Sequence, residues 1–244
     1  MDDRLKHIAD HFETMRIGAD DSFRFHCTQC GKCCINREDI LLCPKDIYNI
    51  AKHLSISQEE VVRRYCETYQ GQGSRLPLVR LKPLGSIKRC PLLKDQKCMV
   101  HQAKPVVCAM FPIGRCIRLD QNQAKHIDTA ELKTEFIFTS PGCGDGAETH
   151  TVREWLASFG IPVEDPDYVC WQRVAIFAST KIREFETRLP KEDIDILLSL
   201  LFGVLYLGYD MNQEFGRQFA DKSKRAIAFL RNLTWKERRT DECR

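Results

Sequence analysis

Four cysteines fall within eight residues near the N-terminus, in the run Cys27-Thr28-Gln29-Cys30-Gly31-Lys32-Cys33-Cys34. Thiolates are soft ligands, and the metal centres that suit them best are zinc and iron–sulfur clusters. The C-x2-C spacing brings two sulfurs to one centre, and a cysteine after two more residues allows the loop to cover three corners of a cluster. Gly31 favours such a loop because glycine adopts a positive φ at little cost. The run therefore predicts a metal site.

The remaining cysteines favour metal binding over disulfide bonding. The chain has thirteen cysteines in 244 residues, and those beyond the first run include Cys90, Cys98, Cys108 and Cys143. A disulfide framework requires an oxidising compartment, whereas the N-terminus has neither the basic nor the apolar region of a secretory signal. Cys33 and Cys34, as neighbours in the chain, are also poor disulfide partners for each other. We therefore expect reduced thiols and a cytoplasmic protein.

The composition is that of an ordinary globular protein. Hydrophobic residues make up 43% of the chain and charged residues 29%, and the formal net charge is only +3. Positive and negative residues are interspersed, whereas nucleic-acid-binding domains usually carry a clustered basic face. The longest uncharged run, residues 196–209, is too short to span a membrane and predicts a buried helix. We expect no nucleic-acid partner and no membrane span.

The hydrophobic pattern predicts an α+β fold with a soft boundary near residue 148. Residues 1–148 form a cysteine-rich metal-binding region, and residues 149–244 form a helical region. Within the first region, residues 76–138 lose the helical period and predict short strands and hairpins. The charged terminus, residues 236–244, is expected to fray.

Capping signals and apolar periodicity define the expected helices. Pro44 opens one helix. Ser57-x-x-Glu60 and Thr151-x-x-Glu154 are capping boxes for two more, and we expect the helix after Ser57 to extend through Tyr69. Cys66 would then lie on its inward face. The other helices are expected over residues 3–16, 167–188, 191–209 and 212–233.

The motifs that carry the cysteines continue beyond the first run. They comprise Cys90-Pro91-Leu92-Leu93, Cys98-Met99-Val100-His101, Lys104-Pro105-Val106-Val107-Cys108-Ala109-Met110-Phe111-Pro112, Pro44-Lys45-Asp46-Ile47 and Pro141-Gly142-Cys143-Gly144. Over residues 23–160 the chain resembles the CxxCxxCC family of zinc- or iron-chelating proteins, the YkgJ-type cysteine cluster proteins related to the flagellin lysine N-methylase FliB. Lys104 stands where that family usually has Arg. The resemblance implies metal chelation, with an iron–sulfur cluster favoured, and no single settled activity.

The candidate metal ligands are the cysteines that match the family pattern: Cys27, Cys30, Cys33, Cys34, Cys90, Cys98, Cys108 and Cys143. Eight thiolates complete two shells of four ligands. Neighbouring side chains on an extended backbone point to opposite sides, so Cys33 and Cys34 serve two centres, or only one of them is a ligand. We expect Cys90 or Cys108 to close the first site.

Other possible ligands are weaker candidates. His26 and His101 lie beside candidate cysteines and could supply nitrogen ligands instead, although a solvated or core histidine is the more common case. Cys43 precedes Pro44, at an expected helix N-cap. The cysteines outside the pattern are Cys43, Cys66, Cys116, Cys170 and Cys243.

Three functions are compatible with these features. The first is an iron–sulfur protein with one or two clusters and a redox, sensing or accessory role; one triple run with single cysteines is closer to cluster binding than to paired zinc knuckles. The second is a zinc-binding module whose helical region docks a protein partner. The third is a protein lysine N-methylase, by analogy with the flagellin methylase. It is the weakest, because the only G-x-G-x-G pattern that could form an S-adenosylmethionine loop, at Gly142–Gly146, contains Cys143, which is better explained as a metal ligand in a turn.

Overall fold

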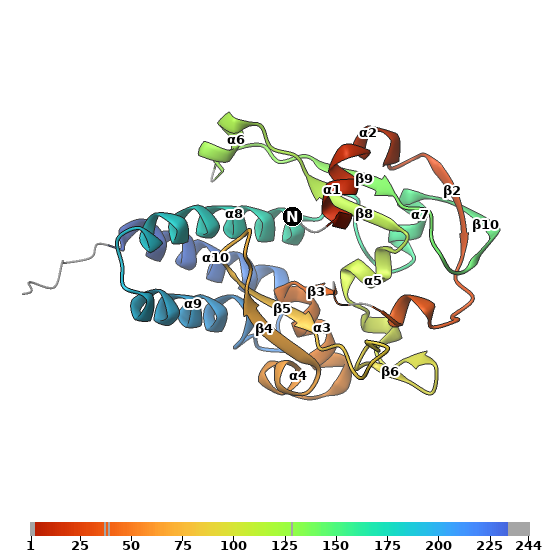
Figure 1. The fold of residues 1–244 in the computed structure, drawn as a ribbon, viewed down its shortest axis with the longest axis horizontal. Helices are drawn as coiled ribbons and strands as arrows, with labels where there is room; N and C mark the ends of the chain where they lie inside the picture. Colours follow the sequence, from red (N-terminus) through yellow and green to blue (C-terminus); the bar gives the residue numbers. More distant parts are fainter. Residues whose placement is uncertain (1–2, 37, 39, 128, 234–244) are drawn as a thin grey trace, which may run out of the picture.

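The computed structural model describes residues 3–36, 38, 40–127 and 129–233 (Figure 1). Cys243 and the terminus expected to fray lie outside the described residues. The chain folds into a mixed α+β structure, which confirms the predicted class. Within the described residues, no helix has the length and apolar character needed to cross a membrane.

Helices dominate the C-terminal part, and short helices are interspersed with strands before it. The α-helices are α1 Asp3–Asp10, α2 Phe12–Met15, α3 Pro44–Leu54, α4 Gln58–Tyr65, α5 Val106–Met110, α6 Gln121–Lys125, α7 Val152–Ala157, α8 Pro166–Glu186, α9 Lys191–Tyr206 and α10 Phe215–Asn232. Two short 3-10 helices accompany them, η1 Lys32–Cys34 and η2 His101–Ala103.

The strands are short and pair in small antiparallel sheets. They are β1 Arg16–Ile17, β2 Ser22–His26, β3 Leu41–Leu42, β4 Cys66–Gln70, β5 Pro77–Leu81, β6 Leu93–Lys94, β7 Lys97–Cys98, β8 Ile113–Ile117, β9 Thr134–Phe138 and β10 Asp145–Thr151. The sheet orders are β1-β9-β8, β10-β2, β3-β5-β4 and β6-β7. The strands β5 to β9 confirm the short strands predicted over residues 76–138, but the same range also contains the short helices α5 and α6, which were not predicted.

Two helix predictions need correction at their C-terminal ends. The helix expected over residues 3–16 is divided into α1 and α2, and Arg16 is extended because it pairs with Ile137 of β9. The helix that Ser57 caps ends at Tyr65, and the chain continues as β4 instead of extending through Tyr69. Cys66 is buried as expected, but on a strand, because β4 pairs with β5 from Cys66 onward.

The first core forms where α3, α4 and the sheet β3-β5-β4 pack against the three long helices. Figure 1 shows α8, α9 and α10 side by side to one side of this sheet. Buried side chains come from both groups, for example Ile47, Val79, Leu201 and Phe219. The buried helix expected over residues 196–209 is only partly correct, since side chains on one face of α9, such as Ile196, remain exposed.

The second core lies under the strands at the opposite end of the molecule. Phe23 and Phe25 of β2 pack with Trp155 of α7, whose indole N–H donates to the Met110 carbonyl at 3.0 Å. Thr151 and Glu154 form the predicted capping box of α7. The boundary expected near residue 148 falls inside β10, and each core contains residues from both sides of it. The cysteine run follows β2 of the second core, while Cys90, Cys98 and Cys108 pack against the first core.

Candidate metal centre

The run Cys27–Cys34 forms a tight loop directly after β2. Gln29 and Gly31 both have positive φ, 52° and 70°, and Gly31 is the N-cap of η1. The Cys34 backbone N–H donates to the Gly31 carbonyl at 2.9 Å, which closes the turn. The predicted need for glycine at this position is met by its left-handed conformation.

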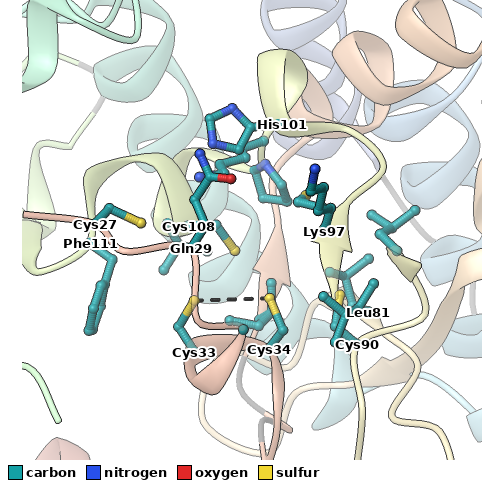
Figure 2. A pocket seen from close by; sticks show the side chains of 18 of the residues that line it. Cys27, Gln29, Cys33, Cys34, Leu81, Cys90, Lys97, His101, Cys108 and Phe111 are labelled. Atoms are coloured by element: carbon teal, nitrogen blue, oxygen red, sulfur yellow. Dashed lines mark hydrogen bonds between the residues drawn. The ribbon is translucent and has the colours of Figure 1, made fainter. Parts of the chain in front are cut away.

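The backbone joins the end of this loop to the second group of cysteines. The Cys90 N–H donates to the Cys34 carbonyl at 2.8 Å, and the Asn36 N–H donates to the Ile87 carbonyl at 3.0 Å. The sulfurs of Cys33 and Cys34 lie 4.0 Å apart, and either thiol can donate the hydrogen between them (Figure 2). Cys34 and Cys90 are therefore held together although 56 positions separate them in the chain.

A two-residue hairpin brings Cys98 back beside Cys90. In the sheet β6-β7, Leu93 pairs with Cys98, and the turn residues Asp95 and Gln96 both have positive φ, 48° and 61°. This hairpin is one of those expected over residues 76–138. The Leu93 N–H also donates to the Cys90 carbonyl at 3.1 Å, so both cysteines share one rigid loop.

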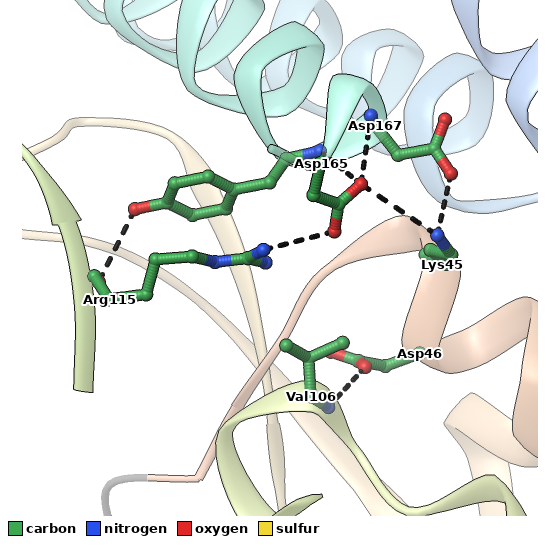
Figure 3. Close-up of polar contacts among 7 residues, drawn as sticks. Lys45, Asp46, Val106, Arg115, Asp165 and Asp167 are labelled. Carbon is green, nitrogen blue, oxygen red and sulfur yellow. Dashed lines mark hydrogen bonds and ion pairs between the residues drawn. The ribbon is translucent and has the colours of Figure 1, made fainter. Parts of the chain in front are cut away.

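Asp46 positions the helix that carries Cys108. Its carboxylate accepts from the Cys43 N–H at the start of α3 and from the Val106 N–H at the start of α5, each at 2.8 Å (Figure 3). The side chain is buried, and burial raises its pKa. A buried carboxylate with hydrogen-bonded partners costs less than an unpaired one. The contact therefore links two helix starts across the first core.

A second buried network fastens the cysteine-bearing region to α8. Arg115 of β8 and Asp165, the N-cap of α8, form an ion pair at 3.1 Å in which both side chains are at most 5% exposed (Figure 3). Lys45 donates to Asp167 at 2.7 Å. These polar contacts were not predicted from the sequence, although Lys45 and Asp46 lie in the motif Pro44–Ile47. Both residues thus tie α3 to other elements.

Cys143 reaches the first run through a glycine turn. Gly144 has φ +71°, and a Cβ atom there would lie 2.5 Å from the His26 carbonyl oxygen. Asp145 pairs with His26 in the sheet β10-β2, which brings the turn back against the start of the run. The Cys143 thiol consequently shares a hydrogen bond with Cys30.

The thiols divide into two sets that meet at Cys33 and Cys34, whose sulfurs lie 4.0 Å apart, and Cys33 also acts on Cys98. Burial, and then the charges of Cys33, Cys30 and Cys27, raise the pKa of Cys143, so these cysteines are neighbours. We define the outer set as Cys27, Cys30, Cys33 and Cys143. Cys90 shares a hydrogen bond with Cys34 and is influenced by Cys108 and Cys98. We define the inner set as Cys34, Cys90, Cys98 and Cys108.

The two sets differ in their surroundings. In the outer set, three thiols belong to exposed residues, and Cys143 is half-buried. In the inner set all four residues are half-buried, and Cys90, Cys98 and Cys108 pack against the first core. Cys143 is influenced by the first three cysteines of the run, and Cys90 and Cys108 line the cavity together with Cys27 and Cys33, so the expectation that Cys90 or Cys108 closes the first site stays a prediction.

Backbone N–H groups point at several of these sulfurs. Cys30 accepts from the N–H of Lys32 and of Gly144, and the Lys32 contact is the main cause of its lowered pKa. Cys90 accepts from the Leu92 N–H, while its hydrogen bond with Cys34 is the main cause of its lowered pKa. Hydrogen bonds to a thiolate favour the ionised form, which is the form that binds metal.

In contrast to Cys30 and Cys90, both thiols of the Cys33–Cys34 pair have raised pKa values. The hydrogen bond with Cys34, then burial, raise the pKa of Cys33. The same bond lowers the pKa of Cys34, but its contact with Cys90 and burial outweigh this and raise the pKa to about 11. Crowded thiols that cannot all ionise are stabilised when a cation binds between them.

A cavity of about 210 Å³ opens between the sets (Figure 2). Cys27, Cys33 and the whole inner set line it, together with basic and apolar side chains, whereas Cys30 and Cys143 do not. No Asp or Glu is among its lining residues. Sulfur ligands without carboxylates suit zinc and iron–sulfur clusters and not calcium or magnesium.

Metal binding requires the thiols to draw closer together. Among the residues that the structure describes, no three His, Cys, Asp or Glu side chains converge tightly enough to hold one metal ion. The thiol ligands are chemically suited to a metal centre. In this structure, however, they line a cavity without converging on one point. Closing either set around a metal would therefore move side chains or loops.

The remaining candidates take structural positions. His26 contacts Asp145 at 3.2 Å, and His101 lines the cavity, where burial and then Lys104 lower its pKa. Cys43 is the N-cap of α3, as expected, and burial raises its pKa. Burial also raises the pKa of Cys66 to about 12, so this thiol is inert at neutral pH.

Comparison with known proteins agrees with the thiol chemistry. Residues 26–136 match the model of the family described as "CxxCxxCC: Putative zinc- or iron-chelating domain". This segment is similar to the CxxCxxCC family. It contains seven of the eight candidate cysteines, and Cys143 lies beyond its end. The similarity supports metal binding by the cysteine-rich segment and does not distinguish zinc from iron.

A curated relative extends the comparison. The uncharacterized protein MJ0661 of Methanocaldococcus jannaschii is 30% identical over 96 residues, which make up 38% of this chain and 47% of the relative. The match therefore spans about half the length of that protein. No solved structure matches the chain. The relation to YkgJ-type proteins and to the flagellin methylase stays a prediction.

Proposed function

We propose that the protein holds two iron–sulfur clusters, one on the outer set and one on the inner set, and that it works in one-electron transfer or redox sensing. The gathering of six of the eight thiols around one cavity without carboxylates, with Cys30 and Cys143 beside Cys33, carries this proposal. Four cysteine ligands are the usual shell of a [2Fe–2S] or [4Fe–4S] cluster. Such clusters, when bound, exchange single electrons.

The backbone donors support a cluster role for the thiols. N–H groups directed at cluster sulfurs tune the reduction potential of an iron–sulfur centre, together with its exposure to solvent. In this chain Cys30, Cys90 and Cys98 each accept from the N–H two residues further on. The sets also differ in exposure, so the proposed centres would have different potentials.

Zinc is the alternative metal, and one contact favours it. The 4.0 Å between the sulfurs of Cys33 and Cys34 is close to the roughly 3.8 Å that two thiolates span in a tetrahedral zinc site with Zn–S bonds near 2.3 Å. A zinc ion shared by this pair would make the chain an interaction module. The number of thiols and the single triple run favour clusters instead.

The test is metal analysis of protein that is expressed, purified and kept without oxygen. We expect brown protein with near-equal amounts of iron and acid-labile sulfide, and roughly eight of each per chain if both clusters are of the [4Fe–4S] type. Colourless protein with zinc alone under these conditions would refute the clusters and leave the ligand assignment to be tested separately.

A further inference from the structure

Positive charge is concentrated in the segment between β5 and α5. Residues 82–104 contain six Lys or Arg side chains and one Asp, whereas the whole chain has a formal net charge of only +3. The rest of the chain is therefore net negative. We define the basic face by the exposed members of this segment: Lys82, Lys88, Arg89, Lys94 and Lys97. The small net charge therefore conceals a strongly basic segment within a chain that is otherwise slightly acidic.

Most of this charge is not neutralised within the protein. Lys88 forms an ion pair with Glu38 at 2.9 Å, while the other members of the basic face make no ion pair with any residue in the described part of the chain. Lys94 and Lys97 are directly opposite each other in the sheet β6-β7. Like charges in this arrangement are destabilising. An anionic partner would relieve that repulsion.

The basic face lies in the segment that carries two cysteines of the inner set, and exposed apolar side chains lie in the same segment. Cys90 and Cys98 belong to the same segment, and Lys97 lines the cavity (Figure 2). Ile87 and Met99 in this segment are 52% and 37% exposed. An apolar centre with a charged rim is the usual anatomy of a protein–protein interface.

We propose that the basic face docks a small acidic electron-carrier protein beside the inner set. This inference rests on the proposed redox function. One electron would pass between the reduced carrier and the oxidised centre, and no bond would form or break. Opposite charges steer such transient encounters and raise their rate at low salt. A nucleic acid is a less suitable partner, since residues 82–104 contain no Phe, Tyr or Trp on which bases could stack.

The test measures the affinity of metal-loaded protein for an acidic plant-type ferredoxin by anaerobic titration calorimetry. The variant Lys94→Glu/Lys97→Glu reverses two charges of the basic face. The control Lys191→Glu/Lys224→Glu makes the same change in net charge at exposed lysines of α9 and α10. We expect the first variant to lose at least about tenfold in affinity and the control to lose at most about twofold, with both differences shrinking at high salt.

Each other outcome decides the proposal as well. Equal affinities in the two variants would overturn it, and so would tighter binding to duplex DNA than to ferredoxin. Iron and sulfide analysis of the same samples separates the two claims. Cluster-loaded protein that does not bind ferredoxin refutes the docking alone. Zinc-loaded protein that binds it refutes the clusters and keeps the docking surface.

Discussion

Cys33 and Cys34 are neighbours in the chain and their thiols contact each other, but each also has thiol neighbours that the other does not have. Cys33 lies beside Cys30 and Cys143 in the outer set, while Cys34 shares a hydrogen bond with Cys90 in the inner set. The 3-10 turn of η1 separates their side chains, and the sulfurs still approach to 4.0 Å. Substitutions at this pair can therefore show whether the protein has one metal centre or two.

Serine substitutions at this pair should remove different centres. Cys33→Ser should lose about half of the iron, from the outer set, and Cys34→Ser the other half, because a cluster with three thiolate ligands is labile. The double variant should lose nearly all of it. Iron and sulfide stoichiometry with electron paramagnetic resonance of each reduced sample checks this.

Cys116→Ser is the matched control, since Cys116 is a half-buried cysteine of β8 outside both sets. It should retain all of the iron. If both single variants instead lost the same spectral species, the pair would share one metal and the division into two sets would be wrong.

At the residue scale, the spacing predicted a loop that carries several thiols, whereas the divergence of Cys33 from Cys34 stays a prediction, since their sulfurs lie 4.0 Å apart. The spacing did not predict that Cys143 lies beside the run, because that depends on the pairing of β2 with β10, which is a long-range contact. The glycines around Cys143 are the local signal that was available. Gly144 is needed for the backbone to approach His26, and a sequence alone does not say which strand a glycine turn will approach.

At the element scale, the turn that carries Cys143 requires a glycine at position 144. Gly144→Ala would place a Cβ atom 2.5 Å from the His26 carbonyl oxygen and 2.6 Å from the Phe25 ring, at φ +71°. We expect a loss of at least roughly 1–2 kcal/mol in the free energy of unfolding, from the left-handed conformation alone. The outer set should lose its metal, and the inner set should keep it.

Gly142→Ala is the control for this substitution, because a Cβ atom at Gly142 meets no heavy atom within 4 Å. Urea unfolding and metal analysis of both variants check the prediction. Equal metal content in the two variants would show that the turn does not position a ligand.

The elements themselves were predictable to different degrees. Capping residues identified α4 and α7 because the N-cap interaction is local in the sequence. The end of α4 was not predictable, since pairing with β5 decides that residues 66–70 are a strand. The role of Asp46 in linking the starts of α3 and α5 was not predicted either. A contact between residues so far apart in the chain produces no periodic pattern in the sequence.

At the scale of the whole molecule, the first core joins the elements α3, α4 and β3–β5 to the three C-terminal helices. Metal removal should therefore leave these parts folded together. We expect amide hydrogen exchange to accelerate most in residues 27–36, 82–108 and 140–146, where the thiols and their loops lie, because a metal that binds only the folded form stabilises the segments that hold it.

The comparison is between metal-loaded and chelated protein under reducing conditions, with Ile47 in α3 and Leu201 in α9 as reporters of the first core. Loss of protection in α3 and α9 at the same rate as in the cysteine loops would mean that the metal supports the whole fold. Unchanged protection everywhere would mean that no metal was bound.

The placement of Cys143 also has a consequence for how the protein matures on the ribosome. The first three thiols of the outer set are synthesised by residue 33, but the fourth follows 110 residues later. At bacterial-to-eukaryotic synthesis rates this delay is roughly 5–20 s. During that interval the exposed cysteines have no fourth partner, and α8–α10, which complete the first core, do not yet exist. If the outer set holds the proposed cluster, that cluster is completed only after most of the polypeptide has been made, and the nascent thiols need a reducing environment until then.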